Sequence, residues 1–215
     1  MHFFLTGTDT AVGKTYFASW LVKRWREQKK NAVGLKPISC GGRDDAELLR
    51  AAGGNILELH EINPLSLKIP GAPYLSAPAE KRVINLPEIN ALVLGRLASF
   101  THGIVEGIGG WLVPIARGLA VREWASELGL PVLVIARAGL GTLNHTLLTV
   151  ESIRQAGLDC PGIVMNAGAP EIGTTEDIVR ESNPEILTEI TGLPVYRFEK
   201  GENPGKPLPH WLGGS

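Results

Sequence analysis

The chain has 215 residues, of which 44% are hydrophobic and 20% are charged, a composition typical of a globular protein with one sizeable core. Its formal net charge of −1 gives no electrostatic reason to bind nucleic acid or an anionic membrane. Two cysteines far apart in the sequence argue against a disulfide framework. No basic segment followed by an apolar leader is present, and we expect a cytoplasmic protein with reduced thiols.

Short apolar runs alternate with segments of helical periodicity along the chain. Residues 2–6 predict a strand, and 14–30 predict a helix with an apolar stripe. The proline-rich stretch 55–84 is expected to be irregular. Further strands are predicted at 32–36, 103–106, 131–136, 162–166 and 194–198, and further helices at 45–52, 86–100 (capped by Asn85), 119–128, 142–156 and 174–191.

This alternation is typical of an α/β fold, with a mostly parallel central sheet and helices on both faces. No repeat or linker divides the sequence, so we expect a single domain over 1–215. The segment 201–215 contains three prolines and is predicted to be an irregular tail.

The segment 7–15, Gly-Thr-Asp-Thr-Ala-Val-Gly-Lys-Thr, follows the first strand and opens the first helix, as a phosphate-binding P-loop requires. Its backbone N–H groups can face phosphates, Lys14 can reach the β- and γ-phosphates, and the Thr15 hydroxyl can bind Mg²⁺. The strict pattern places a glycine at position 8, whereas this chain has Gly7. A chance Gly-Lys-Thr at a helix start is therefore the alternative interpretation.

A second lysine, Lys36, ends the second predicted strand. The carboxyl ends of parallel strands form the ligand crevice of an α/β sheet, so Lys36 is expected to point toward the P-loop. A second ammonium there could stabilise a phosphoryl group during transfer. The alternative is a surface lysine at a strand end.

Two acidic positions could complete a magnesium site with Thr15. Glu106 ends the strand at 103–106, and Asp45 begins the third element. Mg²⁺ prefers a few hard oxygen ligands together with phosphate and water. Asp44 competes with Asp45 for this role, and one of the two is expected only to cap the helix.

These pieces together resemble the dethiobiotin synthetase family. The resemblance covers about three quarters of the chain, from 7 to 166, and its most specific parts are the P-loop and the Glu-Gly-Ile-Gly-Gly-Trp segment at 106–111. The other matching motifs are Lys36-Pro37, Asp45-Ala46, Pro114, Leu140 to His145, Leu147 to Thr149, and Asn166.

The resemblance implies a fold of P-loop NTPase type and an ATP- and Mg²⁺-dependent ring closure. Carbon dioxide adds to one amine of 7,8-diaminopelargonic acid, ATP phosphorylates the resulting carbamate, and the second amine closes a cyclic urea. By resemblance, Lys36 and Lys14 would be the catalytic residues. A homodimer is implied as well.

The resemblance also assigns binding roles residue by residue. Asn166 would read the adenine edge, and the segment from Leu140 to Asn144 would bind the substrate carboxylate at the dimer interface. Mg²⁺ would be held by Thr15, Asp45 and Glu106. The nucleotide would contact Thr10, Ala11, Val12, Gly13, Lys14, Thr15, Tyr16, Asp45, Glu106, Gly107, Ile108, Gly109, Asn166 and Ala167. The substrate would contact Thr10, Cys40, Gly110, Leu140, Gly141, Leu143 and Asn144.

Four features depart from the family pattern, and one of them is that Asn166 is followed by Ala167 and Gly168 and not by the acid often found next. Ala11 stands where many relatives carry an acid, and Cys40 stands where many have Ser or Thr. The segment 195–199, Val-Tyr-Arg-Phe-Glu, replaces a Gly-x-Ile-Pro-like segment beside adenine. The departures concern how the nucleoside and the substrate are held.

Two other functions fit the sequence. One is a partner-regulated switch ATPase of the partitioning type, but its signature lysine would fall where this chain has Asp9. The other is a ligase of the same fold that acts on another small amine or acid.

Overall fold

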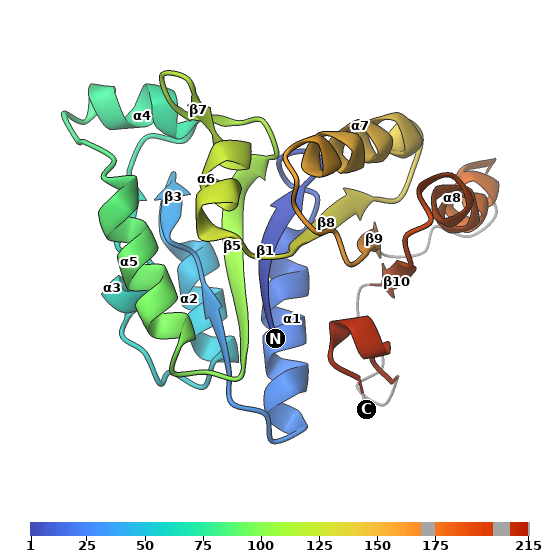
Figure 1. Cartoon of the computed structure of the whole chain (residues 1–215), viewed down its shortest axis with the longest axis horizontal. Coiled ribbons are helices and arrows are strands. Elements are labelled where there is room, and N and C mark those ends of the chain that lie inside the picture. The colour runs from blue at the N-terminus through green and yellow to red at the C-terminus, as the bar shows by residue number, and fades with distance from the viewer. Residues whose placement is uncertain (169–174, 200–206, 215) are drawn as a thin grey trace.

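Figure 1 shows the computed structural model of the chain, which describes residues 1–168, 175–199 and 207–214. Within these residues, six strands form one sheet in the order β10-β9-β8-β1-β5-β2. Every neighbouring pair in this sheet is parallel. Helices lie in front of the sheet and behind it (Figure 1). The predicted α/β architecture is therefore confirmed.

The elements of the sheet and its main helices lie within a few residues of their predicted positions. The strands are β1 (His2–Gly7), β2 (Ala32–Leu35), β5 (His102–Gly110), β8 (Val132–Arg137), β9 (Ile163–Gly168) and β10 (Val195–Glu199). The helices are α1 (Lys14–Glu27), α2 (Asp44–Ala52), α5 (Leu86–Leu97), α6 (Val121–Leu128), α7 (Thr142–Gln155) and α8 (Thr175–Thr191).

The strands bury side chains on both faces of the sheet, which is why they consist of nearly continuous apolar runs. In β1, Phe3 and Leu5 face α1 and belong to one core with its buried residues. Phe4 points the other way and contacts Trp124 of α6, with the two ring centres 5.2 Å apart. The alternation along a single strand thus divides the core into two layers.

The prediction of irregular structure over 55–84 is wrong. This stretch contains α3 (Leu59–Ile62), β4 (Leu65–Leu67) and α4 (Pro73–Ala79), and β4 pairs in parallel with β3 (Ile38–Cys40). Pro73 is the first residue of α4, where a missing N–H costs little, and the short helix also accommodates Pro78 in its interior.

One predicted helix, 119–128, begins two residues later than expected. Leu119–Ala120 forms β7, which pairs antiparallel with β6 (Pro114–Ala116). Helix α6 then starts at Val121, and the Glu123 carboxylate accepts a hydrogen bond from the Ala120 N–H at 2.8 Å. This side-chain bond satisfies a backbone donor at the start of the helix.

The tail is only in part what the sequence predicts. Residues 200–206 and 215 lie outside the described residues, whereas 207–214 contain the 3₁₀ helix η1 (His210–Leu212). Leu208 and Leu212 are buried in the same core layer as α1. The Trp25 indole N–H donates to the Leu212 carbonyl at 2.8 Å. The part of the tail that is described is therefore built into the fold.

Leu212 offers a direct test of this packing. Its side chain is fully buried, so Leu212→Ala should lower the free energy of unfolding by about 2–5 kcal/mol. Chemical denaturation would measure the change. Leu75→Ala is the matched control because Leu75 is 62% exposed, and it should change stability by less than about 0.5 kcal/mol. Equal effects of the two variants would contradict a structural role for the tail.

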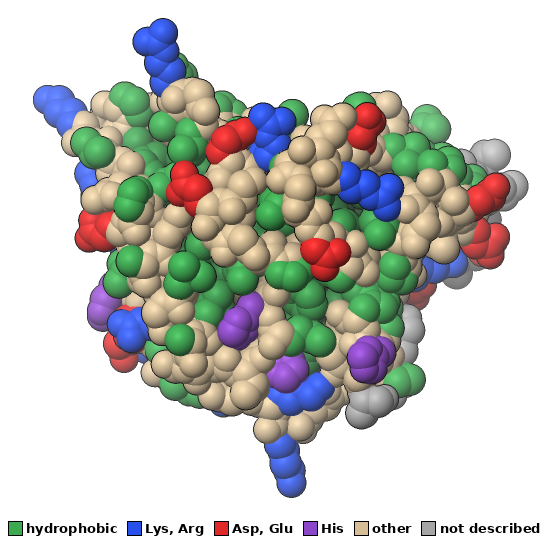
Figure 2. Space-filling model, in the orientation of Figure 1, with side chains coloured by type: hydrophobic (Ala, Val, Ile, Leu, Met, Phe, Trp, Pro, Cys, Tyr) green, Lys and Arg blue, Asp and Glu red, His purple; other side chains and the backbone are tan. Residues whose placement is uncertain are grey.

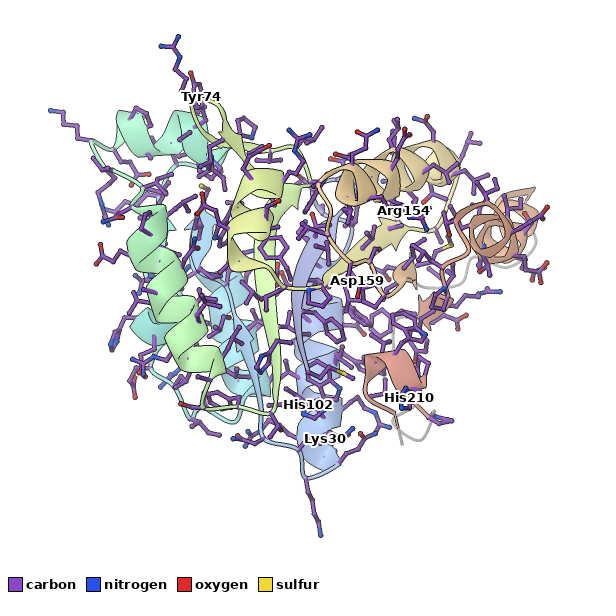
Figure 3. The ribbon with its side chains drawn as sticks, viewed as in Figure 1. Lys30, Tyr74, His102, Arg154, Asp159 and His210 are labelled. Atoms are coloured by element: carbon purple, nitrogen blue, oxygen red, sulfur yellow. The ribbon has the colours of Figure 1, made fainter. Side chains whose placement is uncertain are left out.

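His102 begins β5 at the end of the sheet opposite the carboxyl ends of the strands, close to Lys30 (Figure 3). Its ring centre lies 5.1 Å from that of Trp25. Burial, together with the positive charges of the Met1 ammonium and Lys30, lowers the pKa of His102 from 6.5 to about 4. The folded protein therefore disfavours protonation of this ring.

This pKa shift makes stability depend on pH. Between pH 6.5 and about 4 the unfolded chain binds a proton at His102 that the folded protein does not bind, so stability should fall as pH is lowered through this window. Thermal melts of His102→Gln should show a smaller decrease in Tm from pH 7 to pH 4.5 than the unmodified protein shows. His60→Gln, at an exposed position, is the control. Parallel curves for His102→Gln and the unmodified protein would disprove the contribution.

Candidate active site

The loop between β1 and α1 has the backbone conformation of a phosphate cradle. Ala11 and Gly13 have left-handed φ angles of 58° and 92°. A Cβ atom added to Gly13 would lie 2.0 Å from the Asn166 side-chain nitrogen, so only glycine fits there. The Asn166 amide also donates to the Val12 carbonyl at 3.0 Å. Asn166 thus contacts the P-loop directly from the end of β9.

Lys36 reaches the same place from the end of β2. Its ammonium lies 2.6 Å from Glu106 Oε1 and 3.1 Å from Asp45 Oδ2, and it donates to the Gly107 carbonyl at 3.0 Å. The Lys36 and Glu106 side chains are 4% and 1% exposed. Lys36 is therefore a buried member of a charged cluster and not a surface lysine.

Glu106 is the centre of this cluster. The Thr15 hydroxyl donates to the same oxygen, Oε1, at 2.8 Å. The second carboxylate oxygen, Oε2, is buried and has no hydrogen-bond partner among the described residues. A buried unpartnered carboxylate oxygen beside a P-loop threonine suits a hard cation such as Mg²⁺.

Helix α2 has Arg43 as its N-cap residue and no side-chain capping bond. The expectation that one of the two aspartates, Asp44 or Asp45, serves only as a helix cap is therefore wrong.

The pKa values of the two lysines shift in opposite directions because their surroundings differ. Burial and the neighbouring Lys36 ammonium lower the pKa of Lys14 from 10.5 to about 8. Burial alone would also lower the pKa of Lys36, but the Glu106 and Asp45 carboxylates outweigh it and raise that pKa. The same ion pair lowers the pKa of Asp45 despite its partial burial. The raised pKa keeps Lys36 protonated. The lowered pKa of Lys14 would rise again when an anion binds beside it, which would favour the protonated form.

These groups line one cavity of about 660 Å³ at the carboxyl ends of β1, β2 and β5. Thirteen of the residues singled out from the sequence contribute to its wall: Thr10, Ala11, Gly13, Lys14, Thr15, Tyr16, Lys36, Cys40, Asp44, Asp45, Glu106, Ile108 and Gly109.

The other predicted residues lie outside this wall. Gly110 lines a neighbouring cavity of about 380 Å³, together with Trp111 and residues of α7. The segment 140–144 opens α7, and Leu140 is 88% exposed. Val12, Gly107, Asn166, Ala167, Leu140, Gly141, Leu143 and Asn144 are not among the residues that line either cavity.

Sequence reasoning missed one side of the main cavity. Ser39 and the segment 70–72, just before α4, line it together with Val113. The Ser39 hydroxyl donates to the Asn63 side-chain oxygen at 3.3 Å. Only residues 70–72 come from the stretch 55–84 that was interpreted as irregular. The one signal for this side of the cavity was that Ser39 adjoins Cys40, which the sequence did select.

Within residues 1–168, 175–199 and 207–214, no group of three or more His, Cys, Asp or Glu side chains could hold a metal by itself. In the same part of the chain, no helix is both long and apolar enough to cross a membrane.

Solved structures with the same fold come from several P-loop proteins. A ParA family ATPase from Chlorobium tepidum has a TM-score of 0.53 and 13% identity, and the match covers 93% of this chain and 83% of that one. The MinC:MinD complex from Aquifex aeolicus gives a TM-score of 0.54 with 13% identity over 90% of this chain and 78% of that chain. At this identity the likeness shows the fold alone.

Sequence comparison is more specific. A family model described as an AAA domain matches residues 1–196. The ATP-dependent dethiobiotin synthetase of Akkermansia muciniphila is 39% identical over 90% of this chain and 89% of its own length. That of Anaeromyxobacter dehalogenans is 45% identical over 78% of this chain and 77% of its own. On this similarity, the chain belongs to the ATP-dependent dethiobiotin synthetase family.

Proposed function

We propose that this protein is an ATP-dependent dethiobiotin synthetase acting on 7,8-diaminopelargonic acid and carbon dioxide. The observation that supports it best is the convergence of Lys14 and Lys36 on one cavity, with Glu106 between the P-loop and Lys36. A partitioning-type switch ATPase would carry its signature lysine where this chain has Asp9, and it gives no reason for a lysine at position 36. A second buried lysine suits a reaction in which a second anion, the carbamate, meets the γ-phosphate.

The reaction proceeds in three steps. One amine of the substrate adds to carbon dioxide and loses a proton, giving a carbamate. A carbamate oxygen then attacks the γ-phosphorus of ATP, and ADP leaves. The second amine attacks the carbonyl carbon of the mixed anhydride, phosphate leaves, and the cyclic urea forms. Lys36 binds the carbamate and the phosphoryl oxygens, while Lys14 and the P-loop N–H groups hold the β- and γ-phosphates.

Thr15, Asp45 and Glu106 form the proposed magnesium site. The buried Oε2 of Glu106 has no partner among the described residues, and Thr15 already donates to Oε1. When bound, Mg²⁺ would neutralise charge on the β- and γ-phosphates. Two carboxylates and a hydroxyl suffice for such a site because Mg²⁺ takes much of its coordination from phosphate and water.

We assign the remaining contacts to the nucleotide, the substrate and a second copy of the chain. Asn166 binds the adenine edge, and Thr10 and the Cys40 position bind the carbamate. The substrate carboxylate is bound at the start of α7 by the segment 140–144 of a partner subunit, which gives a homodimer. The exposed Leu112, Leu140 and Leu148 are apolar side chains that such an interface would cover.

The face shown in Figure 2 agrees with small-molecule reactants. Positive and negative side chains are interspersed on it, and among the described residues neither sign gathers into a continuous patch. A nucleic-acid partner would call for a basic stripe. We propose a cytoplasmic location for this chemistry, in keeping with the reduced thiols expected from the sequence.

The test is a reconstituted reaction. Purified protein, diaminopelargonate, ¹³C-bicarbonate, Mg²⁺ and ATP should yield dethiobiotin that carries the label in its ureido carbon, detected by mass spectrometry. ADP and phosphate should appear in equal amounts with the product. Absence of product, with ATP hydrolysis unaffected by the diamine, would exclude the synthetase function.

The two alternatives predict different outcomes of the same assay. A partitioning-type switch ATPase would hydrolyse ATP without needing the diamine. A ligase of another small amine would couple ATP turnover to that amine and leave diaminopelargonate unchanged.

A further inference from the structure

An aromatic side chain reaches the main cavity from the first turn of α1. Tyr16 follows the P-loop threonine directly, is 41% exposed and lines the cavity. Its ring centre lies 5.4 Å from that of Phe198 in β10. A partly exposed tyrosine at a cavity wall offers a flat apolar surface to a ligand.

The Tyr16 ring is supported from behind. Phe198 is fully buried, and its ring centre lies 5.1 Å from that of Phe17 and 4.9 Å from that of Trp20. This aromatic cluster joins α1 to β10 and packs against one side of the Tyr16 ring. A ring that already packs against a buried neighbour loses less conformational entropy when it stacks on a ligand than a ring without such a neighbour.

The position of the cluster matches the nucleoside end of a bound nucleotide. Phe198 pairs in register with Asn166 across β10 and β9. Asn166 in turn contacts Val12 and Gly13 in the P-loop. A nucleotide whose phosphates lie along the P-loop would extend its nucleoside past the start of α1, where Asn166 and Tyr16 both lie.

We propose that the Tyr16 ring stacks on the nucleobase and supplies a large part of the affinity for the nucleoside. Stacking depends on the area of the base and only weakly on its edge groups. This contact therefore favours purines over pyrimidines and discriminates little between adenine and guanine. The inference rests on the proposed function in taking a nucleoside triphosphate as the ligand.

Direct binding tests it without the ring-closure reaction. Isothermal titration calorimetry with Mg²⁺ would compare ATP, GTP, CTP and inorganic tripolyphosphate on the unmodified protein, Tyr16→Ala and Tyr16→Phe. Tyr16→Ala should weaken ATP and GTP by about tenfold and CTP by less, while tripolyphosphate, which has no base, should bind as before. Tyr16→Phe should keep ATP affinity within about twofold because the stacking ring remains.

Steady-state kinetics of ring closure give a second measurement. Tyr16→Ala should raise the KM for ATP and leave kcat unchanged.

Tyr74→Ala is the matched control. Tyr74 is 50% exposed, lies on α4 and is not among the residues that line either cavity (Figure 3). It should bind all four ligands like the unmodified protein. Equal weakening of ATP and tripolyphosphate by Tyr16→Ala would show a distorted P-loop and overturn the inference. Unchanged ATP affinity in Tyr16→Ala would overturn it and leave the synthetase proposal intact, whereas an unmodified protein that binds no nucleotide would overturn both.

Discussion

Lys36→Ala should reduce kcat for ring closure by about 10²–10³-fold, because the ammonium that stabilises the carbamate and the transferring phosphoryl group is lost. ATP should still bind, since Lys14 and the P-loop N–H groups remain. Product formation followed by mass spectrometry, with ATP affinity measured in parallel, separates these two effects. Activity at the level of the unmodified protein would exclude the proposed role.

The same substitution should also destabilise the fold. Lys36 and Glu106 form a buried ion pair at 2.6 Å, and removing one partner leaves a buried carboxylate without its counter-charge. Breaking such a pair costs about 3–5 kcal/mol. Lys36→Met/Glu106→Gln removes both charges and should recover much of this stability without recovering activity. A double variant less stable than Lys36→Ala would contradict the pairing.

Gly13→Ala should lower kcat/KM for ATP by about 10²-fold. A methyl group at this position would lie 2.0 Å from the Asn166 amide nitrogen, so either the loop or Asn166 must move. A displacement of this size at a phosphate-binding loop is expected to cost that much in rate. Initial rates at varied ATP concentration would measure it.

Gly157→Ala is the control for this effect. Gly157 also has a left-handed φ, of 72°, but an added Cβ there would meet nothing within 4 Å. It should therefore lose a little stability from backbone strain and no ATP affinity. If both variants behaved alike, the contact with Asn166 would not explain the requirement for glycine in the loop.

The sequence predicted the position of the site because parallel strands place their carboxyl ends at one edge. The register confirms the geometry behind this argument: Glu106 pairs with Leu5, just before the P-loop begins. Local patterns sufficed to find β1, β2 and β5, and the residues just beyond their ends followed. The binding roles given to these residues stay predictions until they are tested.

The sequence could not predict what depends on tertiary contacts. The sequence suggested that Lys36 points toward a ligand. In the structure, its ammonium forms ion pairs with Glu106 and Asp45. The sequence provided no reason to expect the cavity wall at 70–72, because short elements rich in proline lack a measurable period. The aromatic cluster around Phe198 joins residues some 180 positions apart, and no local pattern connects them.

The docking of η1 on α1 has a consequence for how the protein matures. The Trp25 indole is bonded to a carbonyl 187 residues further along the chain. During synthesis, α1 and β1 emerge from the ribosome early, but Leu208 and Leu212, which complete their core layer, emerge among the last described residues. The nascent chain must therefore keep an apolar face of α1 uncovered while most of the protein is translated. That face is where chaperone protection would matter most.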